Sequence, residues 1–85
     1  MTIEPLFNKK DYIINRAAGD MAIVKGITKK GYYQFYAYYD AMFDELKDLN
    51  KYKYELQVNY QKFWEPCSEE EKNKMDEKLN AVESK

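Results

Sequence analysis

Apolar residues occupy every even position from Tyr52 to Tyr60, and polar residues occupy every odd position between them. Side chains of an extended strand alternate between its two faces, so five consecutive matches to a period of two predict a strand with one buried face. A helix would gather every fourth residue on one side and would leave Tyr54 and Val58 facing away. We therefore predict a strand over about 51–61.

Residues 21–27 and 32–39 are the second sign of a sheet. Both segments are rich in Ile, Val, Tyr and Phe, which favour the pleated state, and they flank Thr28-Lys-Lys-Gly31. Gly31 lies where a three-residue hairpin loop requires a left-handed residue. The pattern predicts a β-hairpin over about 21–39, and residues 11–15 are expected to add a further short strand.

A helix is expected at the C-terminal end of the chain, over about 69–83. Ser68 and Glu71 have the S-x-x-E spacing of a capping box, and three acidic residues fall in the first turn, where they suit the helix dipole. The apolar residues Met75, Leu79 and Val82 then form a narrow stripe along one side.

A second helix is expected over about 40–50. Asp40 can cap its start and Asn50 can end it. The apolar residues on its inner face would be Met42, Phe43, Leu46 and Leu49.

These elements together predict an α+β fold, in which a small antiparallel sheet packs with two helices in a single small domain of residues 1–85. An all-α bundle is the alternative, because the apolar residues from Tyr32 to Leu49 also recur with spacings of three and four. In that alternative, residues 21–39 belong to helices and include a helix-turn-helix.

The segment from Asp20 to Tyr36 resembles the helix-turn-helix of TetR-type repressors. Ala22 precedes Gly26 by four residues, the sequence Gly26-Ile-Thr-Lys matches the turn, and a tyrosine falls where that family places one. The resemblance covers about a third of the chain, and Lys25 departs from the family pattern of a small buried residue before the glycine. It implies a recognition helix capped by its threonine, with these side chains facing the DNA major groove: Lys29, Lys30, Tyr33 and Gln34.

The residue types present restrict the chemistry. The chain has no histidine, which excludes Ser-His-Asp and Cys-His catalysis and every zinc site that contains histidine. Its single cysteine, Cys67, excludes an intramolecular disulfide and fits a reducing compartment, so a cytoplasmic location is expected. No apolar run approaches the length of a membrane span. We expect no enzymatic activity, no cofactor, no bound metal and no membrane partner.

The nine tyrosines are the strongest indication of function. If 32–39 is a regular strand, residues 32, 34, 36 and 38 line one face and residues 33, 35, 37 and 39 line the other. Two small helices cannot cover both faces of the sheet. Exposed rows of aromatic side chains mark interfaces, so we expect a protein-interaction module, an adaptor or an inhibitor. A homodimer is a further expectation, because an exposed strand edge can pair with a second copy. The residues expected to bind a partner are Tyr32, Tyr33, Gln34, Tyr36 and Tyr38.

Nucleic-acid binding is the rival expectation. The charge is uneven, because residues 1–43 carry six basic and four acidic side chains while residues 44–85 carry eight and eleven. Basic side chains at a hairpin tip, or on the recognition helix described above, could contact phosphates. The residues expected in such a contact are Lys25, Lys29, Lys30, Tyr33 and Gln34.

Overall fold

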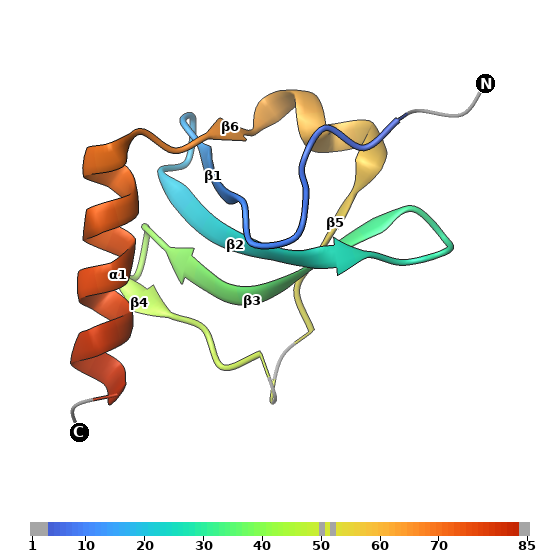
Figure 1. Cartoon of the computed structure of the whole chain (residues 1–85). Helices are drawn as coiled ribbons and strands as arrows, with labels where there is room; N and C mark the ends of the chain where they lie inside the picture. Colours follow the sequence, from blue (N-terminus) through green and yellow to red (C-terminus); the bar gives the residue numbers. More distant parts are fainter. Residues whose placement is uncertain (1–3, 50, 52, 84–85) are drawn as a thin grey trace.

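The computed structural model describes residues 4–49, 51 and 53–83, which form a six-stranded antiparallel sheet with a C-terminal helix (Figure 1). The elements in chain order are β1 (Tyr12–Asn15), β2 (Asp20–Ile27), β3 (Tyr32–Asp40), β4 (Glu45–Leu46), β5 (Glu55–Gln57), the 3-10 helix η1 (Val58–Phe63), β6 (Glu65–Pro66) and α1 (Glu69–Glu83). The strands lie in the order β4-β3-β2-β1-β6, and β5 also pairs with β3. The α+β prediction is confirmed at this level.

The long hairpin of β2 and β3 is the centre of the sheet, and it confirms the prediction for 21–39. Gly31 has a φ of +85°, and its N–H donates to the carbonyl of Thr28 at 3.0 Å. The N–H of Thr28 donates to the carbonyl of Tyr32 at 2.8 Å, which closes the loop. Because residues 20–27 and 32–40 are paired strands, the all-α alternative and the helix-turn-helix resemblance are wrong.

Two bulges interrupt this hairpin and decide which side chains share a face. Ile23 pairs with Ala37 and Val24 with Phe35, so Tyr36 is an extra residue on β3. The next pair is Gly26 with Gln34, which leaves Lys25 as an extra residue on β2. Each extra residue shifts the alternation by one position.

The bulge at Tyr36 overturns the predicted arrangement of the tyrosines. Tyr38 packs on the same face as Phe35, against the core that includes Trp64, whereas Ala37 belongs to the core on the opposite face. A single row of residues 32, 34, 36 and 38 was therefore the wrong expectation, because it assumed an uninterrupted strand.

Each face of the sheet has its own apolar core. On one face, the N-terminal segment and the chain after η1 cover a core whose buried members are Phe7, Ile13, Ala22, Val24, Tyr33, Phe35 and Trp64. On the other face, which we call the α1 face, α1 covers a core whose buried members are Ile14, Met21, Ile23, Ala37, Cys67 and Met75.

The start of α1 forms as predicted. The N–H of Ser68 donates to Glu71 Oε1 at 2.8 Å, and the N–H of Glu71 donates to Ser68 Oγ at 3.2 Å. Arg16, from the turn after β1, donates to the same carboxylate at 2.8 Å and fastens the helix to the sheet. On the inner side of α1, Met75 is buried and Leu79 is half-buried, while the side chain of Val82 lies outside the described residues.

The predicted helix over 40–50 is wrong. Residues 41–44 form a turn, and β4 then pairs with the end of β3. Asp40 accepts from the N–H of Met42 at 3.0 Å, and Asp20 accepts from the N–H of Ala41 at 2.9 Å. These side-chain bonds compete with helical hydrogen bonds, so the backbone takes a turn instead. Asn50, the predicted helix end, lies outside the described residues.

The predicted strand over 51–61 is confirmed only in its centre. Leu56 pairs opposite Tyr33 and is half-buried, with exposed residues on both sides. The ladder ends with Gln57 opposite Tyr32, the first residue of β3. The N–H of Val58 then donates to the carbonyl of Gly31 at 2.9 Å, and the chain continues as η1. Tyr52 lies outside the described residues.

No helix within the described ranges is long and apolar enough to cross a membrane.

Candidate functional site

The α1 helix covers only part of the α1 face, and the half nearer the hairpin loop stays uncovered (Figure 1). Gly26 and Gln34 face each other across β2 and β3 there, and Tyr32 follows two residues along on the same side of β3. The two bulge residues, Lys25 and Tyr36, border this area and are both exposed. We call these five residues the open face.

Gly26 leaves a bare strip of backbone in the middle of the open face. An added Cβ at this position would have no heavy atom within 4 Å, and the residue does not have a positive φ. Neither conformation nor space therefore requires a glycine here. The missing side chain lets another chain approach the backbone of β2 closely.

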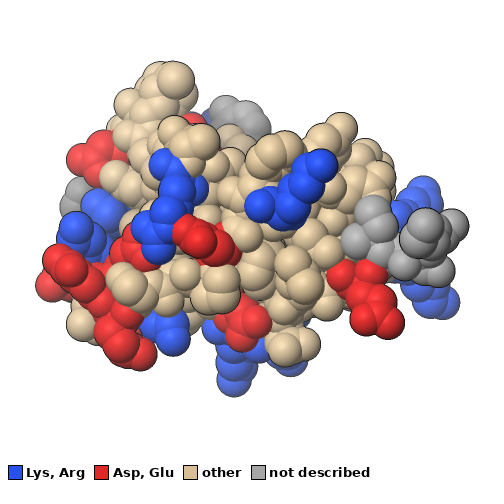
Figure 2. Space-filling view, turned by 90° about the horizontal axis from the view of Figure 1, so that it is seen from above, with Lys and Arg blue, Asp and Glu red and all other residues tan. Residues whose placement is uncertain are grey.

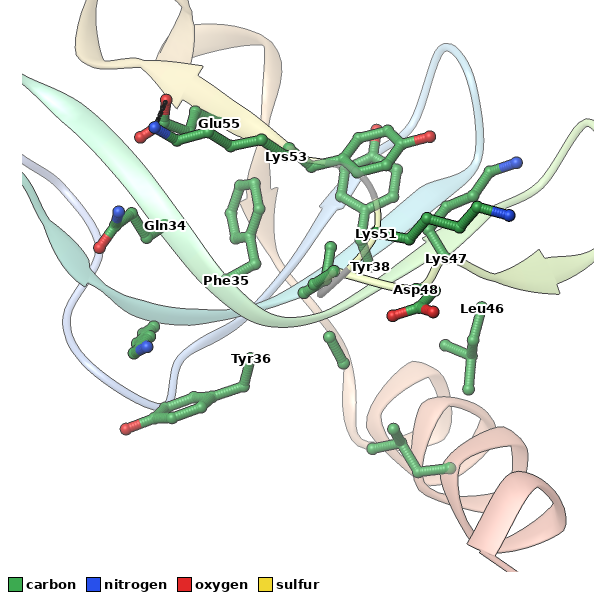
Figure 3. Close-up of a pocket in the computed structure, with 15 residues that line it drawn as sticks. Gln34, Phe35, Tyr36, Tyr38, Leu46, Lys47, Asp48, Lys51, Lys53 and Glu55 are labelled. Atoms are coloured by element: carbon green, nitrogen blue, oxygen red, sulfur yellow. Dashed lines mark ion pairs between the residues drawn. The ribbon is translucent and has the colours of Figure 1, made fainter. Parts of the chain in front are cut away.

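The open face continues into a groove at the outer edge of β3. Two short strands share this edge, β5 opposite Tyr32–Gln34 and β4 opposite Tyr39–Asp40. The N–H of Lys47 donates to the carbonyl of Tyr38 at 2.8 Å, so the stretch without a described partner strand on this side is 35–37. A groove of about 730 Å³ fills the gap (Figure 3). It is lined by Lys25, Gln34, Phe35, Tyr36, Ala37, Tyr38, Leu46, Lys47, Asp48, Leu49, Lys51, Lys53, Tyr54, Glu55 and Leu79.

One wall of the groove is a fixed set of aromatic rings. Tyr38 stacks on Tyr54 with ring centroids 4.8 Å apart, and it also contacts Phe35 at 5.7 Å and Trp64 at 6.1 Å. The hydroxyl of Tyr38 donates to Asp20 Oδ2 at 2.7 Å, and burial followed by this hydrogen bond raises the pKa of Tyr38. Tyr36 points to the opposite side of β3 and is 47% exposed (Figure 3). These contacts fix the positions of the aromatic rings, whereas the exposed ring of Tyr36 is free to contact a binding partner.

The lysines that line the groove differ in their surroundings. Lys47 Nζ lies 2.8 Å from Glu45 and 3.6 Å from Asp40, and Lys53 lies 3.8 Å from Glu55. Lys25, by contrast, is exposed and forms no ion pair with any described residue. The uncompensated positive charge is therefore at the end of the groove that joins the open face.

A second, smaller hollow lies on the other side of the open face, by the hairpin loop. Its volume is about 190 Å³, and its lining includes Lys30, Tyr32 and Gln57. Gln57 Nε2 donates to the hydroxyl of Tyr32 at 3.0 Å, which orients that ring. Lys30 is exposed and, like Lys25, forms no ion pair among the residues that the structure describes.

The molecule is electrically asymmetric along its length. In Figure 2, most of the acidic side chains in view lie on the α1 half, with basic side chains among them, while the end opposite α1 shows mainly basic side chains. Lys9 and Lys10 add to the basic end, because the N–H of Lys10 donates to the carbonyl of Val24 beside the bulge. Both lysines are exposed.

Six of the eight predicted site residues line one of the two hollows. Lys25, Gln34, Tyr36 and Tyr38 line the groove, while Lys30 and Tyr32 line the smaller hollow. Lys29 is exposed in the hairpin loop and lines neither.

Tyr33 corrects the prediction, because its side chain is fully buried. Its hydroxyl donates to Gln61 Oε1 and accepts from the N–H of Leu6 at 2.9 Å. Gln61 also donates to the carbonyl of Glu4 at 2.8 Å. Tyr33 therefore holds the N-terminal segment on the sheet and cannot contact either a protein or a nucleic-acid partner.

Sequence reasoning missed the far wall of the groove. Leu46, Lys47 and Leu49 were assigned to a helix, and no local pattern shows that this segment crosses the edge of β3. It also did not identify the exposed apolar side chains in turns and in η1, because the same residue types are found in the buried core. These are Leu6, Met42, Phe43, Tyr60 and Phe63.

The remaining reactive groups are structural. Burial, followed by the charge of Glu71, raises the pKa of the Cys67 thiol to about 11, so the thiol stays protonated near neutral pH and is a poor nucleophile. Over the described ranges, no group of three or more Asp, Glu or Cys side chains could hold a metal ion.

Comparison with known proteins gives no match to a family model, to a curated protein or to a solved structure.

Proposed function

We propose that this protein is a non-enzymatic interaction module, an adaptor or an inhibitor, that binds a segment of another protein on the open face and in the adjoining groove. The observation that carries the proposal is the bare strip at Gly26, which pairs with Gln34 of the groove lining and has no heavy atom within 4 Å of an added Cβ.

The physical argument is that an extended chain fits this surface. Extended peptides bind next to sheet edges through backbone contacts and place alternate side chains in pockets. The gap between β4 and β5 provides such an edge, with an aromatic wall on one side. Tyr36 supplies a large amphipathic ring of the kind that dominates binding energy at interfaces.

The test begins with a library of random peptides of about twelve residues, displayed on phage and selected on the immobilised full chain. Clones that also bind Gly26→Val are removed. Binding of the remaining peptides is then measured by fluorescence anisotropy. We expect the selection to yield peptides that bind the parent and not Gly26→Val, because the two methyl groups of valine would fill the strip. We expect Tyr36→Ser to weaken binding about tenfold or more, since aromatic anchors are frequent hot spots.

Tyr60→Ser is the matched control, because Tyr60 is 53% exposed, close to the 47% of Tyr36, and lies on η1 outside the open face. It should leave binding unchanged, and circular dichroism should show all three variants folded. The proposal is wrong if no peptide distinguishes the parent from Gly26→Val, or if Tyr36→Ser and Tyr60→Ser behave alike.

Self-association has a separate test. The partner can be a second copy of the chain if the open faces of two molecules pair, in which case sedimentation would show a dimer that Gly26→Val dissociates. A monomer across the concentration range would leave a different protein as the partner.

A further inference from the structure

We propose that the segment bound on the open face is acidic, with carboxylates that reach Lys25 on the groove side and Lys30 on the side of the smaller hollow. This inference rests on the proposed function and identifies the chemistry of the partner. Both lysines line a hollow next to an open-face tyrosine or glutamine, and neither forms an ion pair with a described residue.

The charge distribution supports an acidic occupant. Lys47 and Lys53 already form ion pairs with carboxylates of this chain, whereas Lys25, Lys29 and Lys30 form none with a described residue. All three are exposed. Complementary charge speeds association and fixes the register of the bound chain, while a basic segment would meet repulsion at both ends of the open face.

A short acidic segment fits better than a nucleic acid. The chain as a whole has a net charge of −1, and its basic residues near the open face are few and all lysine. Strong phosphate binding uses about six to ten contacts along the backbone. A longer polyanion would also extend toward the acidic α1 half, whereas a peptide can end before it (Figure 2).

The test uses the peptides that the parent selects and Gly26→Val rejects. We expect them to be enriched in Asp and Glu, to bind more weakly at higher salt, and to lose about two- to thirty-fold in affinity on Lys25→Glu. That range follows because reversing a charge removes one exposed ion pair and adds a repulsion of similar size. Selection on the double variant Lys25→Glu, Lys30→Glu should enrich Lys and Arg instead.

Lys74→Glu on the exposed side of α1 is the matched control, since it makes the same change in net charge away from the open face. It should leave affinity nearly unchanged. Peptides that depend on Gly26 but show no acidic enrichment and no response to Lys25→Glu would overturn the inference and leave the proposed function standing. Failure to find any peptide that depends on Gly26 would overturn both.

A short single-stranded oligothymidine and a DNA duplex, each labelled with a fluorophore, provide the remaining comparison. We expect neither to bind at moderate salt. Tighter binding of either one than of the selected peptides, lost on Lys25→Glu, would assign the lysines to phosphate recognition and overturn the inference.

Discussion

Replacing Gly26 should stabilise the fold while it removes the binding surface. A glycine inside a strand costs about 0.5–1 kcal/mol relative to alanine, because it loses more backbone freedom on folding. Such a glycine is usually retained for a positive φ or for lack of space. Gly26 has neither constraint, since it lacks a positive φ and an added Cβ would meet no atom within 4 Å.

The expected result for Gly26→Ala follows from these magnitudes. Its free energy of unfolding should rise by about 0.5–1 kcal/mol. For a domain of this size, that corresponds to an increase of about 2–8 °C in the midpoint of thermal unfolding. Differential scanning calorimetry measures the midpoint, and urea titration measures the free energy independently.

Gly31→Ala supplies a control of opposite sign. Gly31 has a φ of +85° and closes the hairpin loop, although an added Cβ would lie 3.6 Å from Val58 and would fit sterically. The left-handed conformation costs a residue with a Cβ about 1–2 kcal/mol, so the midpoint should fall by about 4–16 °C. If the two variants shift in the same direction, or if Gly26→Ala destabilises the protein, the reasoning that singles out Gly26 is wrong.

Three further predictions concern the supports of the fold. Tyr33→Phe should lower the free energy of unfolding by about 1–2 kcal/mol, measured by urea titration, because it removes the buried hydroxyl that hydrogen-bonds to Gln61; an unchanged value would contradict the role of this bond. Met75→Ala should cost about 2–5 kcal/mol in the same assay, since Met75 of α1 is buried against the sheet; a cost below about 1 kcal/mol would mean that α1 is not packed on the sheet as described. For Glu71, hydrogen bonds from Arg16 and then from the N–H of Ser68 lower the pKa from 4.5 to about 2. Because the folded-state pKa is depressed, its stabilising contribution is complete above about pH 4.5 and is lost as the pH falls toward 2. Glu71→Gln should therefore be less stable than the parent at neutral pH, and urea titrations at several pH values should show that difference shrinking below pH 4.5; a constant difference would contradict the assignment.

Interactions between residues close in sequence were sufficient to predict the start of α1 and the hairpin loop. Ser68 and Glu71 fixed the start of α1 because a capping box involves only residues within one turn. Gly31 fixed the hairpin loop because the left-handed conformation favours glycine at that position. Prediction failed over 40–50, where Asp20, distant in sequence, binds the backbone of the turn.

The placement of the tyrosines required the tertiary structure. A strict alternation puts Tyr36 and Tyr38 on one side, but the bulges at Tyr36 and Lys25 reverse the faces beyond them. Nothing in the local sequence marks a bulge of this kind, since it depends on how β2 and β3 pair. The same pairing buries Tyr33 completely, although the residues beside it in the sequence are of similar types.

The amino-acid sequence by itself determined the start of α1 and the position of the Gly31 turn, and it excludes histidine-based chemistry, but it left the choice between a hairpin-centred sheet and an all-α bundle open. Those properties depend on residue type, periodicity and local turns. The tertiary structure decided which half of the α1 face stays uncovered and where β3 leaves its edge open. These depend on α1 crossing the sheet at the end opposite the hairpin loop (Figure 1) and on the paths of β4 and β5, which only the packed chain defines.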